Sequence, residues 1–275
     1  MAIKLVAIDI DGTLINDQQQ ITPQTVAALK KASAAGVKVV LCTGRPMTGV
    51  EAYLEELGVA GKDDEYVISF NGSLAQSTSG NVIVNHSISF DDYADWENYC
   101  LKQKVHSQIE TRDYIYTTNQ NLSKYTIYES GLVSMPVRYR SLDEMSRQRD
   151  HYIIAKAMMV DEKDVIDTAL ANLPQDLRDR FSIVRSEDFY LEFMHPSASK
   201  GKTLKTLSDR LGIKQNEVMA LGNAQNDNSM IEFAGIGVAM GNSVPETLKI
   251  ADVTVADNNH DGVAEAVNKY VFGED

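Results

Sequence analysis

The sequence predicts an α/β protein in which a core built on a parallel sheet is interrupted by an inserted α+β domain. Three observations lead to this fold class. Residues 1–72 alternate apolar, β-branched runs with runs of helical periodicity, a pattern typical of a parallel sheet with helices on its faces. Polar residues follow each apolar run directly, at the carboxyl ends of the predicted strands, where open α/β sheets bind ligands. This alternating pattern is interrupted over residues 86–190 and resumes after them.

The first segment of the core carries clear boundary signals. Thr22 and Pro23 are a helix N-cap and a first-turn proline, and Gly36 ends the helix that they begin. Asn71 and Gly72 form a turn signal after an apolar run. We therefore expect strands at 3–10, 37–42 and 66–70 and helices at 22–35 and 47–57.

The middle of the chain differs from its two ends. Residues 86–190 contain the single tryptophan, most of the tyrosines and three short β-like runs, IYTTN, AKAMMV and FSIVRS. We expect this segment to be an inserted α+β domain, joined by two crossings near His86 and Tyr190 to a discontinuous core of residues 1–85 and 191–275. Further expected elements are helices at 91–104, 161–173, 201–211, 227–233, 244–250 and 262–270 and strands at 218–221, 236–239 and 253–255.

Composition narrows the classes of function. The 275 residues carry a formal net charge of −13, which argues against nonspecific nucleic-acid binding because such binding needs a basic surface. No run approaches the roughly 20 apolar residues of a membrane span, and the N-terminal apolar run is too short for a signal peptide. Cys42 and Cys100 lack the spacing of metal ligands. We therefore expect a cytoplasmic protein with reduced thiols and with neither a membrane nor a nucleic acid as partner.

The strongest motif is DIDGTL at residues 9–14, behind the first predicted strand. The carboxylates of Asp9 and Asp11 could approach one cation, and one could attack phosphorus while the other transfers protons. Gly12 permits a sharp turn that aims both acids the same way. The alternative interpretation is a solvated acidic turn, and for a lone D-x-D this would be the better interpretation. The full hexapeptide after an apolar strand is a more specific signal of a catalytic site.

This hexapeptide resembles the first motif of the haloacid dehalogenase superfamily, in its phosphatase branch. The family's further motifs follow in order: LCTGRP contains Thr43, SKGKTL contains Lys200, and GNAQND at 222–227 matches the usual G-D-x-x-N-D except at one position. The stretches NGS, VAMGNS and DGVA resemble the Cof-type subfamily of sugar-phosphate and related phosphatases. The resemblance implies a Rossmann-like parallel-sheet core of this type, with the inserted domain as its large α/β cap.

The resemblance also implies catalytic roles. Asp9 would attack the phosphoryl group and form an aspartyl-phosphate. Asp11 would protonate the leaving oxygen and then take a proton from the hydrolytic water. The Thr43 hydroxyl and the Gly44 N–H would bind phosphoryl oxygens, and Lys200 would bring positive charge to the anionic transition state.

A magnesium site is implied by the same resemblance. Mg²⁺ needs about six oxygen ligands, and similarity places it on Asp9, the carbonyl of Asp11 and the side chain of Asn223, with Asp227 close by. The family usually has a carboxylate at position 223, whereas asparagine offers one carbonyl oxygen without the charge. Either the site tolerates weaker metal binding, or catalysis is impaired, or Asn223 is an introduced change.

Three further residues are candidates for binding phosphate or substrate. Arg45 could reach the substrate or only brace its own loop through backbone carbonyls. Asn71 could touch the ligand or only shape a turn, and Asn226 belongs to the fourth motif. His195, in contrast, is expected to be structural or to face solvent, because the mechanism already has its acid and base.

Together these features predict a magnesium-dependent phosphatase that hydrolyses small phosphorylated metabolites, such as sugar phosphates, through an aspartyl-phosphate. Two alternatives remain on the same fold. One is a phosphosugar-binding or regulatory protein that Asn223 makes weakly catalytic, and the other is a phosphotransferase such as a mutase. Dehalogenase chemistry is disfavoured, because Asp11 is the acid that a phosphatase needs for its leaving group. The sequence leaves open the substrate, the specificity residues of the cap and the oligomeric state.

Overall fold

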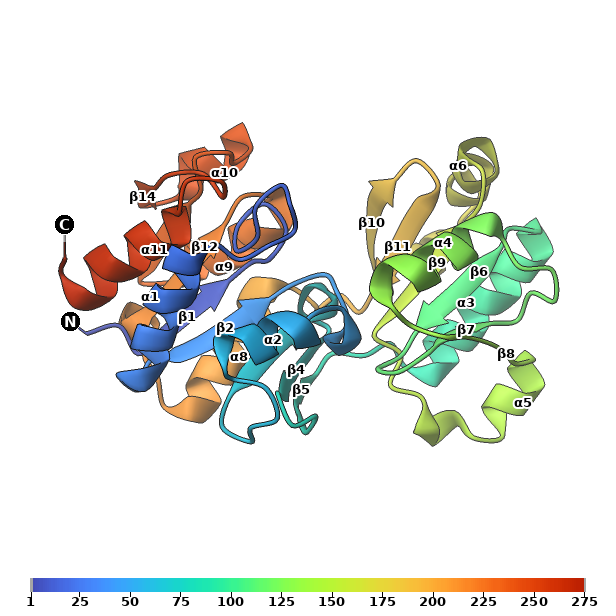
Figure 1. The fold of residues 1–275 in the computed structure, drawn as a ribbon. Helices are drawn as coiled ribbons and strands as arrows, with labels where there is room; N and C mark the ends of the chain where they lie inside the picture. Colours follow the sequence, from blue (N-terminus) through green and yellow to red (C-terminus); the bar gives the residue numbers. More distant parts are fainter. Residues whose placement is uncertain (1, 275) are drawn as a thin grey trace. The chain divides into compact units, whose positions relative to one another are not determined.

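The computed structural model describes residues 2–274 and divides them into two compact units. The first unit comprises residues 2–45, 50–85 and 199–274, and the second comprises Pro46–Gly49 and His86–Ala198. In Figure 1 the first unit carries the blue and orange-red colours of the two ends of the chain, and the second carries green and yellow. The second unit is therefore inserted into the first.

An eight-stranded sheet forms the centre of the first unit, with strand order β14-β13-β12-β1-β2-β3-β4-β5. The strands from β14 to β3 are parallel, whereas β4 and β5 add an antiparallel hairpin that was not predicted from the sequence. The strands are β1 (Leu5–Ile8), β2 (Lys38–Cys42), β3 (Tyr66–Ser69), β4 (Leu74–Ser77), β5 (Val82–Asn85), β12 (Val218–Gly222), β13 (Ile236–Ala239) and β14 (Val253–Thr254).

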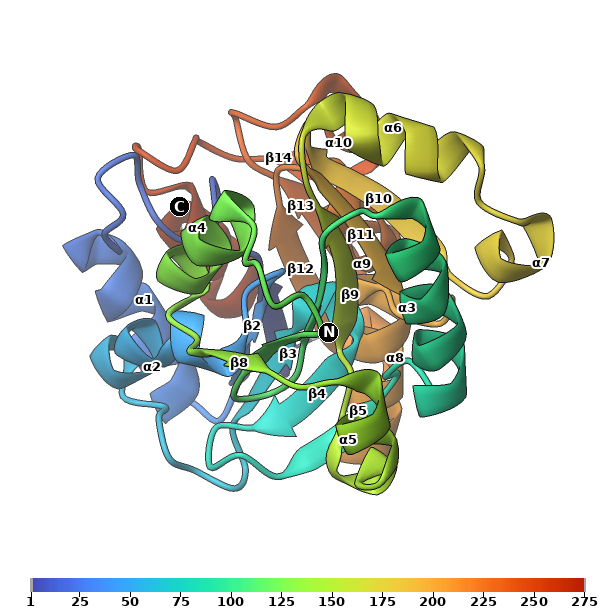
Figure 2. The same ribbon diagram turned by 90° about the vertical axis from the view of Figure 1, so that its right-hand side faces the viewer.

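Helices cover both faces of this sheet. On one face, Leu204 and Met230, from α8 and α9, pack with Leu5 of β1, and α1 and α2 lie on the opposite face (Figure 2). The Thr22 hydroxyl accepts the Thr25 N–H at 3.3 Å and caps α1, as the sequence indicates. The helices are α1 (Pro23–Ala34), α2 (Glu51–Leu57), α8 (Lys200–Leu211), α9 (Asn228–Phe233), α10 (Pro245–Ile250) and α11 (Gly262–Val267).

The second unit is built on a six-stranded sheet of order β10-β11-β9-β6-β7-β8. All neighbours in it are antiparallel except β7 and β8. The three β-like runs of the sequence become β7, β9 and β10. The elements are α3 (Phe90–Gln103), β6 (Ser107–Glu110), β7 (Ile115–Thr117), α4 (Lys124–Val133), β8 (Val137–Tyr139), α5 (Leu142–Ser146), β9 (Lys156–Val160), α6 (Lys163–Ala171), α7 (Gln175–Arg178), β10 (Ser182–Glu187) and β11 (Tyr190–Met194).

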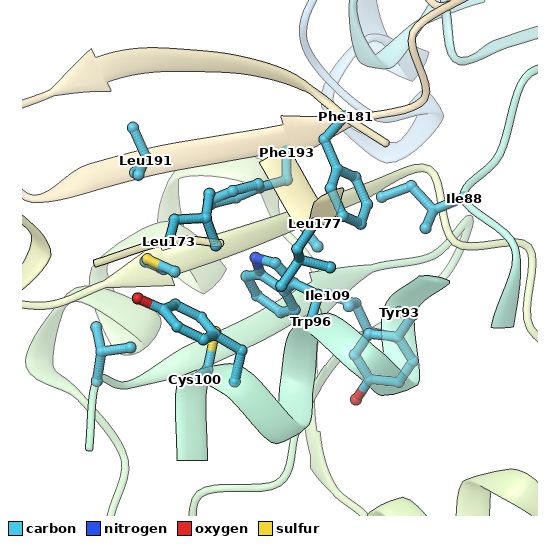
Figure 3. Close-up of a cluster of buried hydrophobic side chains, with 14 of the residues drawn as sticks. Ile88, Tyr93, Trp96, Cys100, Ile109, Leu173, Leu177, Phe181, Leu191 and Phe193 are labelled. Atoms are coloured by element: carbon cyan, nitrogen blue, oxygen red, sulfur yellow. The ribbon is translucent and has the colours of Figure 1, made fainter. Parts of the chain in front are cut away.

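The two faces of this second sheet differ in chemistry. On one face α3, α6 and α7 enclose an apolar cluster in which Trp96 packs against Phe193, with ring centroids 5.2 Å apart (Figure 3). Helix α4 lies on the other face of the sheet (Figure 2). On that face Lys156 Nζ lies 3.3, 3.7 and 3.4 Å from carboxylate oxygens of Glu110, Glu129 and Glu192. All four of these side chains are buried, so α4 is held to the sheet through a buried charge cluster.

The boundaries of the units correct the sequence expectation at two places. The second unit extends to Ala198 rather than to 190, because β11 pairs with β9 and β10. The expected helix 47–57 is split, since Met47–Gly49 is a separate 3₁₀ turn that belongs to the second unit. There the Thr48 hydroxyl donates to the Val133 carbonyl at 3.1 Å. The chain therefore passes between the units four times rather than twice. Within residues 2–274, no helix has both the length and the apolar character that a membrane crossing requires.

Candidate active site

The sheet order brings the candidate residues to one edge of the first unit. Strand β1 lies between β2 and β12, with Ile8 in register with both Leu41 and Leu221. The residues that follow these parallel strands therefore meet at their carboxyl ends, where ligands bind in open α/β sheets. Asp9 follows β1, and its N–H donates to the Leu221 carbonyl at 3.0 Å.

Asp9, Lys200 and Asp227 form a buried ionic centre at this edge. Lys200 Nζ lies 2.7 Å from Asp9 Oδ1 and 2.6 Å from Asp227 Oδ1. Lys200 is the first residue of α8 and is 1% exposed, so it is not a surface lysine. Gly201 is required behind it, because a Cβ there would lie 2.0 Å from the Ser229 carbonyl oxygen. This close approach of α8 and α9 brings the lysine between the two carboxylates.

Two buried acids share one cation at this centre, and both burial and the second acid affect the pKa of Asp9. Burial, followed by the nearby carboxylate of Asp227, raises the pKa of Asp9 to about 7, against the opposing effect of Lys200. For Lys200, burial disfavours the charged form, but the two carboxylates outweigh burial and raise its pKa. The centre therefore keeps excess negative charge that a further cation would neutralise.

The second oxygen of Asp227 organises the loop after β12. Its Oδ2 accepts the backbone N–H of Asn223 at 2.9 Å and that of Ala224 at 3.0 Å. Gly222 lies directly against it, since a Cβ at 222 would come within 2.4 Å of the Asp227 Cβ. Both carboxylate oxygens of Asp227 thus accept hydrogen bonds, one from Lys200 and the other from the loop after β12.

Asn223 contacts the turn that follows Asp9. Its Oδ1 accepts the Thr13 hydroxyl at 3.1 Å, and its amide lies over Gly12, where a Cβ would be only 2.4 Å from Asn223 Nδ2. Gly12 also has a φ of +78°, which favours glycine. From the other side, Asn242 Nδ2 donates to the Gly12 carbonyl at 2.8 Å. Two asparagines therefore fix the DIDGT turn.

Asp11 takes a different partner from Asp9. Arg45 donates to it in a bidentate pair, Nε to Oδ2 at 3.0 Å and Nη2 to Oδ1 at 2.6 Å. The Asp11 side chain is 55% exposed, and Gln19 Oε1 accepts a further bond from Arg45 at 3.2 Å. The guanidinium therefore holds the Asp11 side chain, whereas Asp9 pairs with Lys200. Through this pair Arg45 links the loop after β2 to the loop after β1.

Thr43, Gly44, Asn71 and Asn226 lie together beside this pair. The buried Thr43 hydroxyl accepts the Arg45 N–H at 3.0 Å, and the Thr43 carbonyl accepts the Asn71 N–H at 2.9 Å. Asn226 Nδ2 donates to Asn71 Oδ1 at 3.1 Å. The side chain of Asn71 lies against Gly44, where a Cβ would be 3.2 Å from its amide nitrogen. All the residues singled out from the motifs thus lie in the first unit, around the ends of β1, β2, β3 and β12.

The oxygen donors here suit a hard cation. Among residues 2–274, no three His, Cys, Asp or Glu side chains gather as a metal would need them. The donors at the site are instead of mixed kind, namely the Asp9 carboxylate, the Asn223 amide oxygen and main-chain carbonyls. Mg²⁺ accepts such oxygens and keeps several waters. Because two buried carboxylates share the single charge of Lys200, this donor set fits a divalent cation.

Some contributing residues were not found from the sequence. Thr13 lies within the first motif, which could have indicated it. Gln19 and Ser229 carry no signal of their own, since they meet Arg45 and Gly201 only through the fold. His195 lies in the second unit, where its Nδ1 accepts the Ser197 N–H at 3.1 Å, a structural contact as expected.

Comparison with known proteins gives matches along nearly the whole chain. The family model described as haloacid dehalogenase-like hydrolase matches residues 6–267. A protein of Streptococcus pyogenes serotype M6, provisionally named as a phosphatase, is 44% identical over 273 residues, covering 99% of this chain and 100% of that protein. A Bacillus subtilis protein with the same provisional name is 40% identical, covering 98% and 99%. A haloacid dehalogenase-like hydrolase from Bacteroides thetaiotaomicron has a crystal structure that aligns with a TM-score of 0.84 at 28% identity, covering 97% and 99%. The similarity therefore includes both units.

Proposed function

The chain belongs to the haloacid dehalogenase-like hydrolase family, and from this premise we propose that it is a magnesium-dependent phosphatase of small phosphorylated metabolites. The observation that carries the proposal is the buried centre in which Lys200 lies between Asp9 and Asp227. The provisional naming of relatives at 44% and 40% identity as phosphatases supports it. The family's fold and the oxygen donors support the choice of metal.

In the proposed reaction Asp9 is the nucleophile. A carboxylate oxygen of Asp9 bonds to phosphorus as the bond from phosphorus to the leaving oxygen breaks. Lys200 is fixed by Asp227 and offers a pre-oriented positive charge to the developing oxyanions. The Thr43 hydroxyl and the Gly44 N–H would donate to phosphoryl oxygens. Water then attacks phosphorus, and the Asp9 carboxylate is released together with inorganic phosphate.

Asp11 is proposed to transfer the protons. It gives a proton to the leaving oxygen in the first step and takes one from water in the second. The bidentate pair with Arg45 holds its carboxylate at the exposed side of the site. That pair must open for the acid step, because both carboxylate oxygens accept bonds from the guanidinium. Arg45 would thus control when Asp11 is released.

A bound divalent cation would be held by Asp9, Asn223 and the main-chain carbonyl of Asp11. Its chemistry would be to neutralise the charge of Asp9 and of the phosphoryl oxygens. The elevated pKa of Asp9 means that, without a cation, much of it is protonated near neutral pH and cannot attack.

The test is release of inorganic phosphate from a panel of phosphorylated metabolites and aryl phosphates, with and without Mg²⁺. Asp9→Asn should abolish release, and Asp17→Asn, which changes an exposed carboxylate of the following loop, should not. Labelled substrate should leave acid-stable, hydroxylamine-labile phosphate on the protein but not on Asp9→Asn. Phosphate release by Asp9→Asn, once deamidation is excluded, would show that Asp9 is not the nucleophile. Transfer of the label to a second sugar without release of phosphate would indicate a mutase instead.

A further inference from the structure

Residues Phe70–Gly72 form an unusual turn directly after β3. Their φ angles are 51°, 53° and 95°, so three consecutive residues have left-handed backbone. Glycine takes this conformation freely and asparagine tolerates it, but it is uncommon for a bulky residue such as phenylalanine. Phe70 is nevertheless 1% exposed. Backbone strain of this kind persists only where the surroundings hold it, and it is concentrated at functional sites.

One side of the turn holds the loop that follows β2. The Phe70 N–H donates to the Arg45 carbonyl at 3.3 Å, and the Asn71 N–H donates to the Thr43 carbonyl at 2.9 Å. Gly44, between these two, has the Asn71 amide against its Cα. The backbone of Thr43–Arg45 is therefore held at both ends by this turn.

The other side of the turn holds the start of α8 and the loop after β12. Gly72 packs closely on Ser199, because a Cβ at position 72 would lie 2.3 Å from the Ser199 carbonyl carbon. The Gly72 carbonyl accepts the Thr203 hydroxyl at 2.6 Å. The Asn71 side chain accepts the Asn226 amide at 3.1 Å. The turn thus contacts the three segments that carry Thr43, Lys200 and Asp227.

We propose that Asn71 is a positioning residue that sets the spacing between the Thr43–Arg45 loop and the Asn226–Asp227 turn, and that it does not itself bind substrate. Its N–H contacts the first segment and its side chain contacts the second, and asparagine is suited to both the contact and the left-handed backbone. The inference rests on the proposed function, because the phosphoryl group would lie between these segments. A misplacement of about 1 Å can reduce turnover on the order of a hundredfold.

The decisive variant is Asn71→Gly, which keeps the left-handed backbone and removes only the amide. With an aryl phosphate and saturating Mg²⁺, kcat should fall about tenfold or more, while KM and the inhibition constant of inorganic phosphate stay within about twofold. Asn71→Ala should lose at least as much and should also unfold at a lower temperature, because alanine strains the turn. The double variant Asn71→Gly/Asn226→Ala should be no slower than the slower of the two single variants, because each substitution breaks the same hydrogen bond between Asn71 and Asn226.

Lys104→Gly is the matched control, because it introduces glycine at another left-handed position, the C-cap of α3 in the second unit. It should leave kcat unchanged. An Asn71→Gly protein with the kcat of the wild type would overturn the proposal. A higher KM and weaker phosphate inhibition at unchanged kcat would also overturn it, because they would show that Asn71 binds the substrate. Multiplicative effects in the double variant would overturn the contact with Asn226.

Failure of the proposed function is distinguishable from these results. It would appear as absent or Asp9-independent phosphate release by the wild-type protein. The double-variant cycle can in that case be read from the free energy of unfolding, which does not require turnover. Additive destabilisation by the two substitutions would then overturn the bridge between Asn71 and Asn226.

Discussion

Asp9→Asn should stabilise the metal-free protein even though it removes the proposed nucleophile. Burial and the neighbouring Asp227 raise the pKa of Asp9 from its ordinary value of 3.8 to about 7, so the folded state disfavours the ionised carboxylate. Each pKa unit corresponds to about 1.4 kcal/mol. The folded state therefore loses roughly 4 kcal/mol above pH 7 relative to a chain with no charge at position 9. Asparagine has nearly the same shape and cannot ionise, so it avoids this loss.

The pH dependence follows from the same shift. Below about pH 4 Asp9 is protonated in both the folded and the unfolded chain, and the two proteins should be equally stable. Between about pH 4 and 7 only the unfolded chain ionises, so the wild type loses stability as pH rises and the advantage of Asp9→Asn grows. Above about pH 7 the advantage is constant.

The assay is urea unfolding in a chelator at pH 5 and pH 8, followed by circular dichroism. Trp96 lies in the second unit, so its fluorescence serves as an internal reference that the substitution should not change. Asp17→Asn, at an exposed position, should behave as the wild type at both pH values. An Asp9→Asn protein that is no more stable at pH 8, or whose gain persists unchanged at pH 5, would refute the reasoning. Added Mg²⁺ should stabilise the wild type more than the variant.

Three further predictions concern acid catalysis, the metal and the second unit. Asp11→Asn should slow the phosphorylation step by about 10²–10⁴ for poor leaving groups and by less for good aryl ones, and equal losses in a leaving-group series would contradict the acid role. Asn223→Asp adds a charged oxygen against the turn that follows Asp9 and should lower the Mg²⁺ concentration for half-maximal turnover, whereas an unchanged or higher midpoint would show that position 223 does not bind the metal. Lys156→Met leaves three buried glutamates without their cation and should reduce the unfolding free energy by about 3–5 kcal/mol. Lys163→Met, which removes an exposed i,i+4 pair, should cost about 0.5 kcal/mol or less, so similar urea midpoints for the two lysine variants would contradict the importance of the buried cluster.

Local signals in the sequence were sufficient for many elements of this fold. The Thr22 cap, the proline after it and Gly36 define α1 because capping depends on residues adjacent along the chain. The apolar runs that become β1, β2 and β3 are likewise local, and their alternation with helices predicts a parallel sheet. The β4–β5 hairpin and β11 were not predicted, because their assignment depends on the strands with which they pair.

The chemical identities of the site were also readable from the sequence. Asp9, Thr43, Lys200 and the 222–227 loop each stand in a short motif, and the structure brings them to one edge of the sheet. The motifs did not indicate which groups would pair. Asp11 is held by Arg45 rather than sharing a partner with Asp9.

The sequence by itself determined the kinds of side chain available, the order of the motifs and the local elements that present them. Only the tertiary structure decided that Lys200 lies between Asp9, 191 residues away, and Asp227, and that Asn71 meets Asn226 across 155 residues. These contacts depend on the order of strands in the sheet and on close approaches permitted by Gly201 and Gly222. Burial and pKa shifts follow from them, because both depend on which groups surround an atom in space rather than along the chain.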